Sequence, residues 1–329
     1  MRRLLIALAA LVAICALAVG CGEKEESLEP GAPEPLEVML DFFPNADHAP
    51  IYAADAAGYF KDVGLDVQIR QPSDPAAPLK QVVAGRVDLA ISYEPEVLRA
   101  RDDGLAVHSV GALVQKPLTS IISLPQAGIR KPEDLDGKVV GTAGIDYQSA
   151  YLDAIAKRAG VDVEERNVGF NLTGALLAKK VDAILGGFWN YEGTDLRLRG
   201  KNPQIIRIED AGVPNYDELV IVANSDQDDD RIKRFIAALE RGVEDLKRDP
   251  DKALNGLLDA NPDLDPELQR EVLKVTLPLF SPPRGKPYGW QDPGEWNDFA
   301  HWMRDNELLD NLIDADDSFT NQYLPGEVP

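Results

Sequence analysis

The sequence predicts an α/β protein of two lobes, each built around a parallel sheet. Apolar, strand-like runs alternate with helical patterns along the chain, as in parallel sheets that are covered by helices on both faces. One unit of this alternation occurs twice: Gly-Leu-Asp-Val at 64–67 is matched by Gly-Val-Asp-Val at 160–163, and Ala-Gly-Arg-Val-Asp at 84–88 by Ala-Lys-Lys-Val-Asp at 178–182. The 329 residues also exceed the ~100 to 150 of a typical domain. Each half of the chain is therefore expected to carry its own sheet.

The first 35 residues are predicted to direct and anchor the protein. Arg2 and Arg3 precede an apolar run, and Leu17-Ala-Val-Gly-Cys21 resembles a bacterial lipobox, with alanine in place of the usual leucine three residues before the cysteine. We expect a signal peptide over 1–20, lipidation of Cys21, and an acidic, proline-rich tether over 21–35. An ordinary cleaved signal or a short anchor is the alternative, although the run is shorter than the ~20 residues of a spanning helix. The expected location is extracytoplasmic, lipid-anchored to a bacterial cell membrane.

Composition excludes several classes of function. The two cysteines, Cys15 and Cys21, both belong to the predicted signal, so the rest of the chain has no disulfide, no cysteine metal site and no thiol nucleophile. A net charge of -22 argues against nucleic acid as a partner, since phosphate binding needs clustered Lys and Arg. The three histidines, His48, His108 and His301, form no metal pair at helical spacing, and no nucleophile elbow occurs.

The first lobe begins with an apolar strand over 36–40, which Pro44 and Asn45 break. Pro50 suits the first turn of a helix through Tyr59, where its missing N–H costs nothing. A strand over 64–69, a helix over 79–85 and a strand over 87–91 follow. Because parallel sheets place ligands outside the carboxyl ends of their strands, the loop after the first strand is predicted to face a ligand. Asp41, Asn45, Asp47 and His48 lie in this loop, and Asp41, Asn45 and His48 are the predicted ligand contacts. The structural alternatives are a loop bridge for Asp41 and a helix-start hydrogen bond for His48.

Further candidates follow the later strands. Tyr93, Glu94 and Glu96 come just after the strand over 87–91, although acidic residues also suit an exposed first turn of a helix. The loop 141–147, which includes Thr142 and Tyr147, lies between a strand and a helix start, where free N–H groups can bind a polar substituent. Its glycines lack the third position of the dinucleotide fingerprint.

The second lobe repeats the pattern, with helices over 151–159 and 174–180 and strands over 160–163 and 181–185. Trp189, Tyr191 and Glu192 follow the last of these strands, so they are expected to project into a cleft. A core position for Trp189 is the alternative. Two crossings, over 110–124 and 218–223, connect the lobes, which we place at 36–122 with 224–329 (lobe 1) and at 123–223 (lobe 2). A tail helix over 231–247, with apolar residues at helical spacing, is expected to pack back on lobe 1.

This arrangement resembles, over essentially the whole chain, the type II solute-binding proteins of ABC importers. The segments 41–52, 58–61, 92–97 and 186–192 are similar to the branch that includes thiamine-pyrimidine-precursor binding proteins and the fungal pyrimidine-precursor synthase. The resemblance implies a two-lobed type II periplasmic-binding-protein fold with two crossing strands. It also implies a monomer that delivers its ligand to an ABC permease and its ATPase.

The same resemblance implies a ligand of the formylaminopyrimidine or hydroxymethylpyrimidine type. Trp189 and Tyr191 would stack on the flat ring, Glu192 would accept from the exocyclic amine, and the candidate residues of lobe 1 would complete the site. Sulfonates such as taurine, nitrate or flavin-type ligands are the alternatives, but an anion binder would show a committed Arg or Lys in the cleft. A surface-interaction lipoprotein without a ligand is a further alternative.

An enzyme is not expected, and neither is a cofactor or a metal. The fungal synthase uses an active-site histidine, a lysine that binds pyridoxal phosphate, and a cysteine-rich iron segment. Alignment of residues 87–96 with the synthase pattern puts Ser92 at the place of the lysine and Glu96 at the place of the histidine. The absence of cysteine after residue 21 excludes the iron segment.

Overall fold

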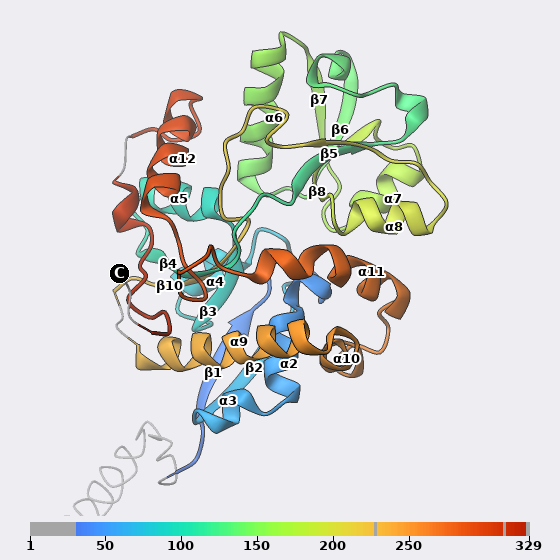
Figure 1. The fold of residues 1–329 in the computed structure, drawn as a ribbon. Helices are drawn as coiled ribbons and strands as arrows, with labels where there is room; N and C mark the ends of the chain where they lie inside the picture. The colour runs from blue at the N-terminus through green and yellow to red at the C-terminus, as the bar shows by residue number, and fades with distance from the viewer. Residues whose placement is uncertain (1–30, 227–228, 312–313, 327–329) are drawn as a thin grey trace, which may run out of the picture. The chain divides into compact units, whose positions relative to one another are not determined.

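Two five-stranded sheets frame the protein, and helices pack on their faces (Figure 1). The computed structural model describes residues 31–226, 229–311 and 314–326. The first sheet has the order β2-β1-β3-β10-β4 and the second β7-β6-β8-β5-β9. The strands of the first sheet are β1 (Glu34–Met39), β2 (Leu65–Arg70), β3 (Leu89–Ser92), β4 (Val107–Val114) and β10 (Leu219–Asn224). The strands of the second are β5 (Thr119–Ser123), β6 (Lys138–Thr142), β7 (Val163–Asn167), β8 (Ala183–Phe188) and β9 (Gln204–Arg207).

The prediction of parallel sheets is only partly correct. β1 runs parallel to β3, and β6 runs parallel to both β7 and β8. However, β10 is antiparallel to β3 and β4, and β5 is antiparallel to β8 and β9. β5 and β10 are the strands that follow a passage between the sheets, so they enter their new sheet from the opposite end.

The helices lie close to their predicted places. They are α2 (Ala49–Ala56), α3 (Tyr59–Asp62), α4 (Pro78–Val83), α5 (Glu94–Asp102), α6 (Asp146–Ala159), α7 (Leu172–Leu177), α8 (Glu192–Leu198), α9 (Asp230–Arg248), α10 (Pro250–Ala260), α11 (Pro266–Thr276) and α12 (Pro293–Asp305). Short 3-10 turns are η1 (Ala46–His48), η2 (Pro125–Ala127), η3 (Pro132–Leu135), η4 (Leu277–Phe280) and η5 (Ala315–Asp317). The helix predicted through Tyr59 is in fact two, because Gly58 adopts a left-handed φ of 76° between α2 and α3.

The tail helix packs as its apolar spacing predicts. The residues of α9 that are buried include Ile232, Phe235, Ile236, Leu239, Val243 and Leu246. Asp229 caps its start, because the Asp229 carboxylate accepts from the Arg231 N–H at 2.9 Å. Farther along, α12 buries Trp296, Phe299 and Met303. The C-terminal part of the chain therefore contributes to the core around the first sheet.

The chain passes from the first sheet to the second between β4 and β5 and returns between β9 and β10. Both changes of sheet lie a few residues before the predicted lobe boundaries at 122/123 and 223/224, which stay predictions. Glu218, fully buried, ties the two passages together. It accepts from the N–H groups of Leu118 and Thr119 at 2.6 and 2.8 Å, from the Thr119 hydroxyl at 2.9 Å and from the Tyr216 hydroxyl at 2.9 Å. Burial raises the pKa of Glu218 to about 7.

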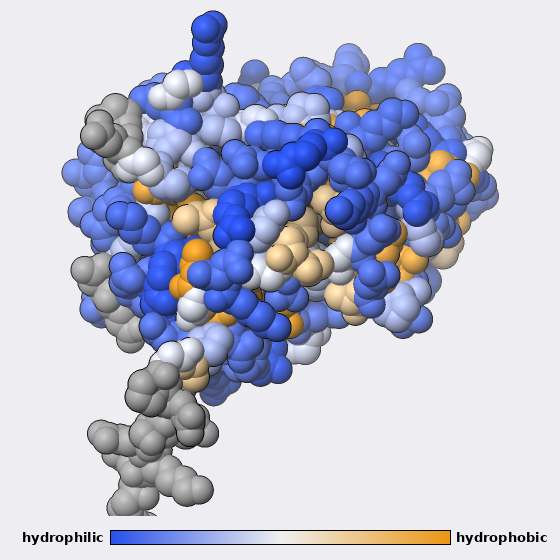
Figure 2. All heavy atoms as spheres, turned by 60° about the horizontal axis from the view of Figure 1, so that its bottom comes forward, coloured by the Kyte–Doolittle hydropathy of each residue, from blue (hydrophilic) through white to orange (hydrophobic). Residues whose placement is uncertain are grey.

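The predicted signal peptide, Cys21 and the tether up to residue 30 lie outside the described residues. Residues Pro35–Pro329 form one compact unit that holds nearly all of both sheets. Within the described part of the chain, no helix is both long and apolar enough to cross a bilayer. The face shown in Figure 2 is mostly hydrophilic and carries only small apolar areas.

Candidate ligand-binding site

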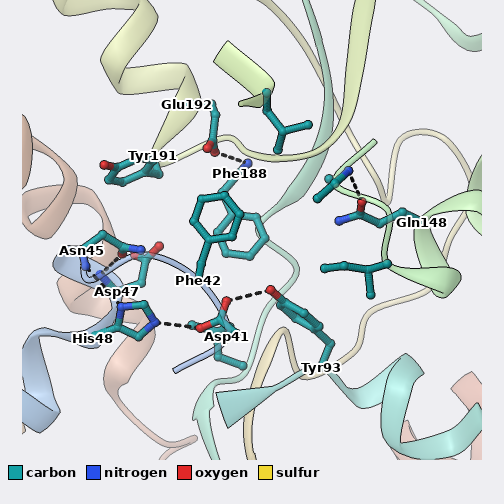
Figure 3. A pocket seen from close by; sticks show the side chains of 15 residues that line it. Asp41, Phe42, Asn45, Asp47, His48, Tyr93, Gln148, Phe188, Tyr191 and Glu192 are labelled. Carbon is teal, nitrogen blue, oxygen red and sulfur yellow. Dashed lines mark hydrogen bonds and ion pairs between the residues drawn. The ribbon is translucent and has the colours of Figure 1, made fainter. Parts of the chain in front are cut away.

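A pocket lies between the two sheets (Figure 3). Most of its walls come from residues at or just after the ends of β1, β3, β6 and β8, that is, from strand ends in both sheets. This is where parallel strands of α/β proteins place their ligands. The lining residues are Asp41, Phe42, Asn45, Asp47, His48, Tyr93, Ala143, Ile145, Gln148, Leu172, Gly186, Phe188, Tyr191, Glu192 and Leu219.

On the side of the first sheet, Asp41 is held by two buried donors. The Asp41 Oδ1 atom lies 2.7 Å from His48 Nε2, and the Tyr93 hydroxyl donates to Oδ2 at 2.7 Å. His48 Nδ1 accepts from the Asn45 N–H at 3.2 Å, so the ring proton must sit on Nε2 and point to Asp41. Burial, followed by the Asp41 charge, raises the pKa of Tyr93 well above its ordinary value, which keeps it a donor.

Asn45 explains why the loop after β1 turns so tightly. Its extended backbone, with a φ of -157°, and its side chain form the N-cap of η1, where Oδ1 accepts from the Asp47 N–H at 2.8 Å. The Ala46 N–H donates to the Gln269 side chain at 2.8 Å, which fixes the turn to α11. The polar residues of this loop therefore hold one another in place before any ligand arrives.

Asp47 connects the pocket to the opposite lobe. The Asn190 side chain donates from Nδ2 to Asp47 Oδ1 at 2.6 Å, and the Thr276 hydroxyl donates to the same oxygen at 3.1 Å. Burial raises the pKa of Asp47 to about 6, against the lowering effects of His48 and of these hydrogen bonds. Asp47 Oδ2 is buried and has no hydrogen-bond partner among the described residues.

The second lobe supplies a carboxylate and aromatic rings. Glu192 Oε2 accepts from the Phe188 N–H at 2.7 Å, and burial raises the Glu192 pKa to about 7. Burial likewise raises the pKa of Tyr191 to about 12, so its hydroxyl stays protonated. Phe42 points into the pocket between Glu192 and Asp41 (Figure 3). The pocket thus combines flat apolar rings with hydrogen-bond acceptors at its edges.

Gln148 forms the wall opposite Asp47. Its Oε1 accepts from the Ala143 N–H at 2.8 Å, which turns the amide nitrogen the other way, toward the pocket (Figure 3). Gly186 lies against this amide with a φ of 93°, and a Cβ there would collide with the Gln148 side chain. Glycine at position 186 therefore serves two purposes: it adopts the left-handed backbone conformation, and it leaves room for the Gln148 side chain.

Six of the eleven residues predicted to contact ligand line this pocket: Asp41, Asn45, His48, Tyr93, Tyr191 and Glu192. Two of the remaining five, Glu94 and Glu96, belong to α5 and hydrogen-bond to groups outside the pocket lining. Glu94 accepts from the Asp217 N–H at 2.6 Å, beside the return passage of the chain. Glu96 accepts from the Ser92 hydroxyl at 2.6 Å. Glu94 and Glu96 therefore lie in the first turn of α5 rather than in the wall of the pocket, to which Tyr93 belongs.

The other three are also engaged away from the pocket. Thr142 donates to Glu165 of the neighbouring strand β7 at 2.6 Å. Tyr147 is fully buried among other tyrosine rings. The Trp189 indole donates to the Pro117 carbonyl at 3.1 Å, and a guanidinium lies over its ring. Trp189 therefore braces the first passage between the sheets, and the pocket lining does not include it.

The sequence prediction missed several lining residues: Phe42, Ala143, Ile145, Gln148, Leu172, Gly186, Phe188 and Leu219. Asp47 lies in the loop after β1 that was predicted to face a ligand, but it was not itself predicted to contact the ligand. Phe188 is the last residue of β8, so its place at a strand end could have identified it as a lining residue. Gln148 lies in the first turn of α6, after the loop 141–147, and no local pattern distinguishes it. In the described residues, no cluster of three or more His, Cys, Asp or Glu side chains is placed to hold a metal.

Comparison with known proteins gives three consistent findings. A profile of the family described as "NMT1/THI5 like" matches residues 45–253. The formylaminopyrimidine-binding protein of Halalkalibacterium halodurans is 35% identical over 298 residues, covering 88% of this chain and 90% of that protein. A 4-amino-5-hydroxymethyl-2-methylpyrimidine phosphate synthase of Legionella pneumophila is 26% identical, over 88% of this chain and 92% of the enzyme.

Solved structures agree on the fold. The alkanesulfonate-binding protein of Xanthomonas axonopodis pv. citri, bound to MOPS, superposes with a TM-score of 0.66 at 17% identity, covering 88% of this chain and 99% of that one. This likeness confirms the predicted two-lobed fold of periplasmic binding proteins.

Proposed function

Because this chain belongs to the NMT1/THI5-like family, we propose that it is the substrate-binding component of an ABC importer and binds a pyrimidine precursor of thiamine between its lobes. The observation that carries the proposal is the pocket between the two sheets, with aromatic rings inside and carboxylates at its edges. Flat rings beside hydrogen-bonding side chains suit a small, flat ligand with polar substituents.

The chemistry of the lining favours an amine-bearing, flat ligand over an anion. Asp47 and Glu192 offer acceptor oxygens, while no lysine or arginine stands among the fifteen described residues that line the pocket. A sulfonate or nitrate would leave its charge unpaired beside these carboxylates, which is costly in a buried site. An aminopyrimidine instead offers N–H donors to the carboxylates and ring nitrogens to a donor such as Gln148.

Closure of the lobes is the proposed mechanism. Ligand contacts from both lobes stabilise the closed form relative to the open one, and the two passages between the sheets absorb the rotation. Glu218 joins these passages, so they would bend as one unit. The closed form would then be presented to a permease and its ATPase.

A binding role is favoured over synthase chemistry by two substitutions. Ser92 and Glu96 stand where the resemblance places the cofactor lysine and the reactive histidine, and they hydrogen-bond to each other at 2.6 Å. A serine cannot form the imine that a lysine forms with pyridoxal phosphate. Titration with pyridoxal phosphate should give no imine absorbance, whereas a stable imine band that borohydride traps would argue for an enzyme.

We also propose that Cys21 is acylated and that the protein is held outside the cytoplasm by this anchor. The support is the lipobox-like Leu17-Ala-Val-Gly-Cys21. Mass spectrometry of the N-terminal peptide should find a diacylglyceryl group on Cys21, and the Cys21→Ser variant should leave the membrane fraction. A peptide cleaved elsewhere and free of lipid would remove the anchor.

The deciding experiment is isothermal titration calorimetry of residues 31–329. Formylaminopyrimidine and hydroxymethylpyrimidine are the test ligands, with taurine and riboflavin as controls. Micromolar or tighter binding of a pyrimidine alone, about -8 kcal/mol or better, is expected. Binding of taurine or riboflavin instead would keep a transport role and discard the pyrimidine.

A further inference from the structure

We infer that Asp47 and Asn190 form a latch that holds the two lobes closed, and that the second carboxylate oxygen of Asp47 accepts a hydrogen bond from the ligand. The ligand would thus contact the latch directly and favour its closure. The latch stands on the geometry alone, whereas the identity of the ligand rests on the proposed function.

The latch joins segments that belong to different sheets. Asp47 lies in η1, just after β1 of the first sheet, and Asn190 follows β8 of the second. Asn190 Nδ2 lies 2.6 Å from Asp47 Oδ1 and 2.7 Å from Thr276 Oγ1, at the end of α11. Asp47 is 1% exposed and the other two are fully buried. A charge-assisted hydrogen bond in such a dry setting is stronger than one in water.

The latch leaves two acceptor oxygens to which no described residue donates. Asp47 Oδ2 and Asn190 Oδ1 are buried and have no hydrogen-bond partner among the described residues. A buried acceptor without a donor loses the hydration it had in water and receives nothing in return. Because Asp47 also lines the pocket, an N–H group of the ligand can reach this side of the carboxylate. Closure over an empty pocket is therefore less favourable than closure over an amine-bearing ligand.

A second contact across the cleft is apolar and does not involve the latch. Phe43, after β1, lies 4.3 Å from Phe170 of the second lobe, measured between ring centroids. Phe42 lies 4.8 Å from the same ring. This contact can hold the mouth of the cleft, but it carries no information about hydrogen-bond donors on the ligand. Asp47 is the residue that both lines the pocket and bonds across the cleft.

Three variants separate the role of the latch in closing the lobes from the role of Asp47 in contacting the ligand. Asp47→Asn keeps an oxygen for Asn190 but replaces the free acceptor by a donor, so it should retain closure and lose affinity. Asn190→Ala removes the bond across the cleft and leaves the pocket side of Asp47 unchanged. Asn202→Ala, an exposed asparagine of the second lobe, is the matched control.

Closure is measured first, without ligand. Residues 31–329 contain no cysteine, so spin labels can be attached at Lys61→Cys and Lys201→Cys, both exposed positions in different lobes, and their distance read by double electron–electron resonance. The unsubstituted protein and the Asn202→Ala variant should both show a closed population that Asn190→Ala depletes. If the closed population of Asn190→Ala equals that of the unsubstituted protein, the latch is overturned, whatever the ligand is. The same holds if the unsubstituted protein shows no closed population.

Affinity is measured second, by calorimetry with formylaminopyrimidine and hydroxymethylpyrimidine. Asp47→Asn should weaken binding at least tenfold while ligand at saturation still closes the lobes, and Asn190→Ala should weaken binding severalfold. Affinity within twofold of the unsubstituted protein in Asp47→Asn would overturn the ligand contact of Asp47. If the unsubstituted protein binds neither pyrimidine, the proposed ligand and the contact fail together, and the distance measurement still decides the latch.

Discussion

Replacing Glu218 by alanine should destabilise the passages between the sheets more than any change to an exposed carboxylate. The Glu218 carboxylate accepts four hydrogen bonds, two of them from the backbone N–H groups of Leu118 and Thr119. The hydroxyls of Thr119 and Tyr216 can rotate toward other acceptors. The two N–H groups cannot, because their direction is set by the backbone as it enters β5.

The expected loss follows from these two donors. A buried donor left without an acceptor costs ~1 to 3 kcal/mol, so Glu218→Ala should lower the free energy of unfolding by about 2 to 6 kcal/mol. The measurement should be made near pH 5. Burial raises the pKa of Glu218 to about 7, so its carboxyl group is protonated in the folded protein at that pH. The loss of unfolding free energy in Glu218→Ala is then not offset by the removal of a buried charge.

Urea denaturation, followed by circular dichroism, measures the loss. Glu209→Ala, an exposed carboxylate on the same returning segment, is the control and should stay within ~0.5 kcal/mol. A loss below ~1 kcal/mol for Glu218→Ala would refute the reasoning, since it would mean that water or another group satisfies both N–H donors.

The isosteric variant Glu218→Gln tests the pH dependence with the hydrogen bonds largely kept. Folding raises the pKa of Glu218 from 4.5 to about 7, so the folded protein binds the proton more tightly than the unfolded chain. The stability that this provides is full below pH 4.5 and is lost as the pH rises to 7. Relative to Glu218→Gln, the unsubstituted protein should therefore lose about 3 kcal/mol over that window. Parallel stability curves would contradict the raised pKa.

Three further outcomes are expected. Glu192→Gln should weaken pyrimidine binding ~10- to 100-fold, because a buried hydrogen bond to a charged group contributes ~1.5 to 3 kcal/mol; an unchanged melting temperature is the control. Burial raises the Glu192 pKa to about 7, so binding through its ionised form should strengthen from pH 6 to 8 with release of a proton, and a fall in affinity would mean that Glu192 donates instead. Trp189→Phe should lower stability by ~1 kcal/mol through loss of the bond to Pro117 and leave the affinity for the pyrimidine within threefold.

The helices and strands could be predicted because their signals are local. Apolar spacing placed α9 within a residue at each end, and the repeated glycine-led segments marked the starts of β2 and β7. The direction of β5 and β10 could not be predicted in this way. Strand direction is decided by pairing with strands far away in sequence, such as β10 with β3, and no local pattern encodes it.

The site was predictable at the level of strand ends but not of individual side chains. Asp41 and Glu192 line the pocket because the residues after β1 and β8 must face the cleft. Trp189 has the same signal, yet its indole is captured by the Pro117 carbonyl of the passage between the sheets. The bond between Asp47 and Asn190 joins residues 143 positions apart, so only the folded chain reveals it.

The place of β10 in the first sheet also governs the order in which the protein can fold. β10 lies between β3 and β4 and pairs with both, although more than a hundred residues separate it from each. All five strands of the second sheet, in contrast, come from residues 119–207. Contacts between distant parts of a chain form slowly because the intervening loop must first be closed. The second sheet can therefore assemble while the first still lacks the strand between β3 and β4. Until residue 224 has joined, β3 and β4 expose unpaired edges that are prone to association with other chains.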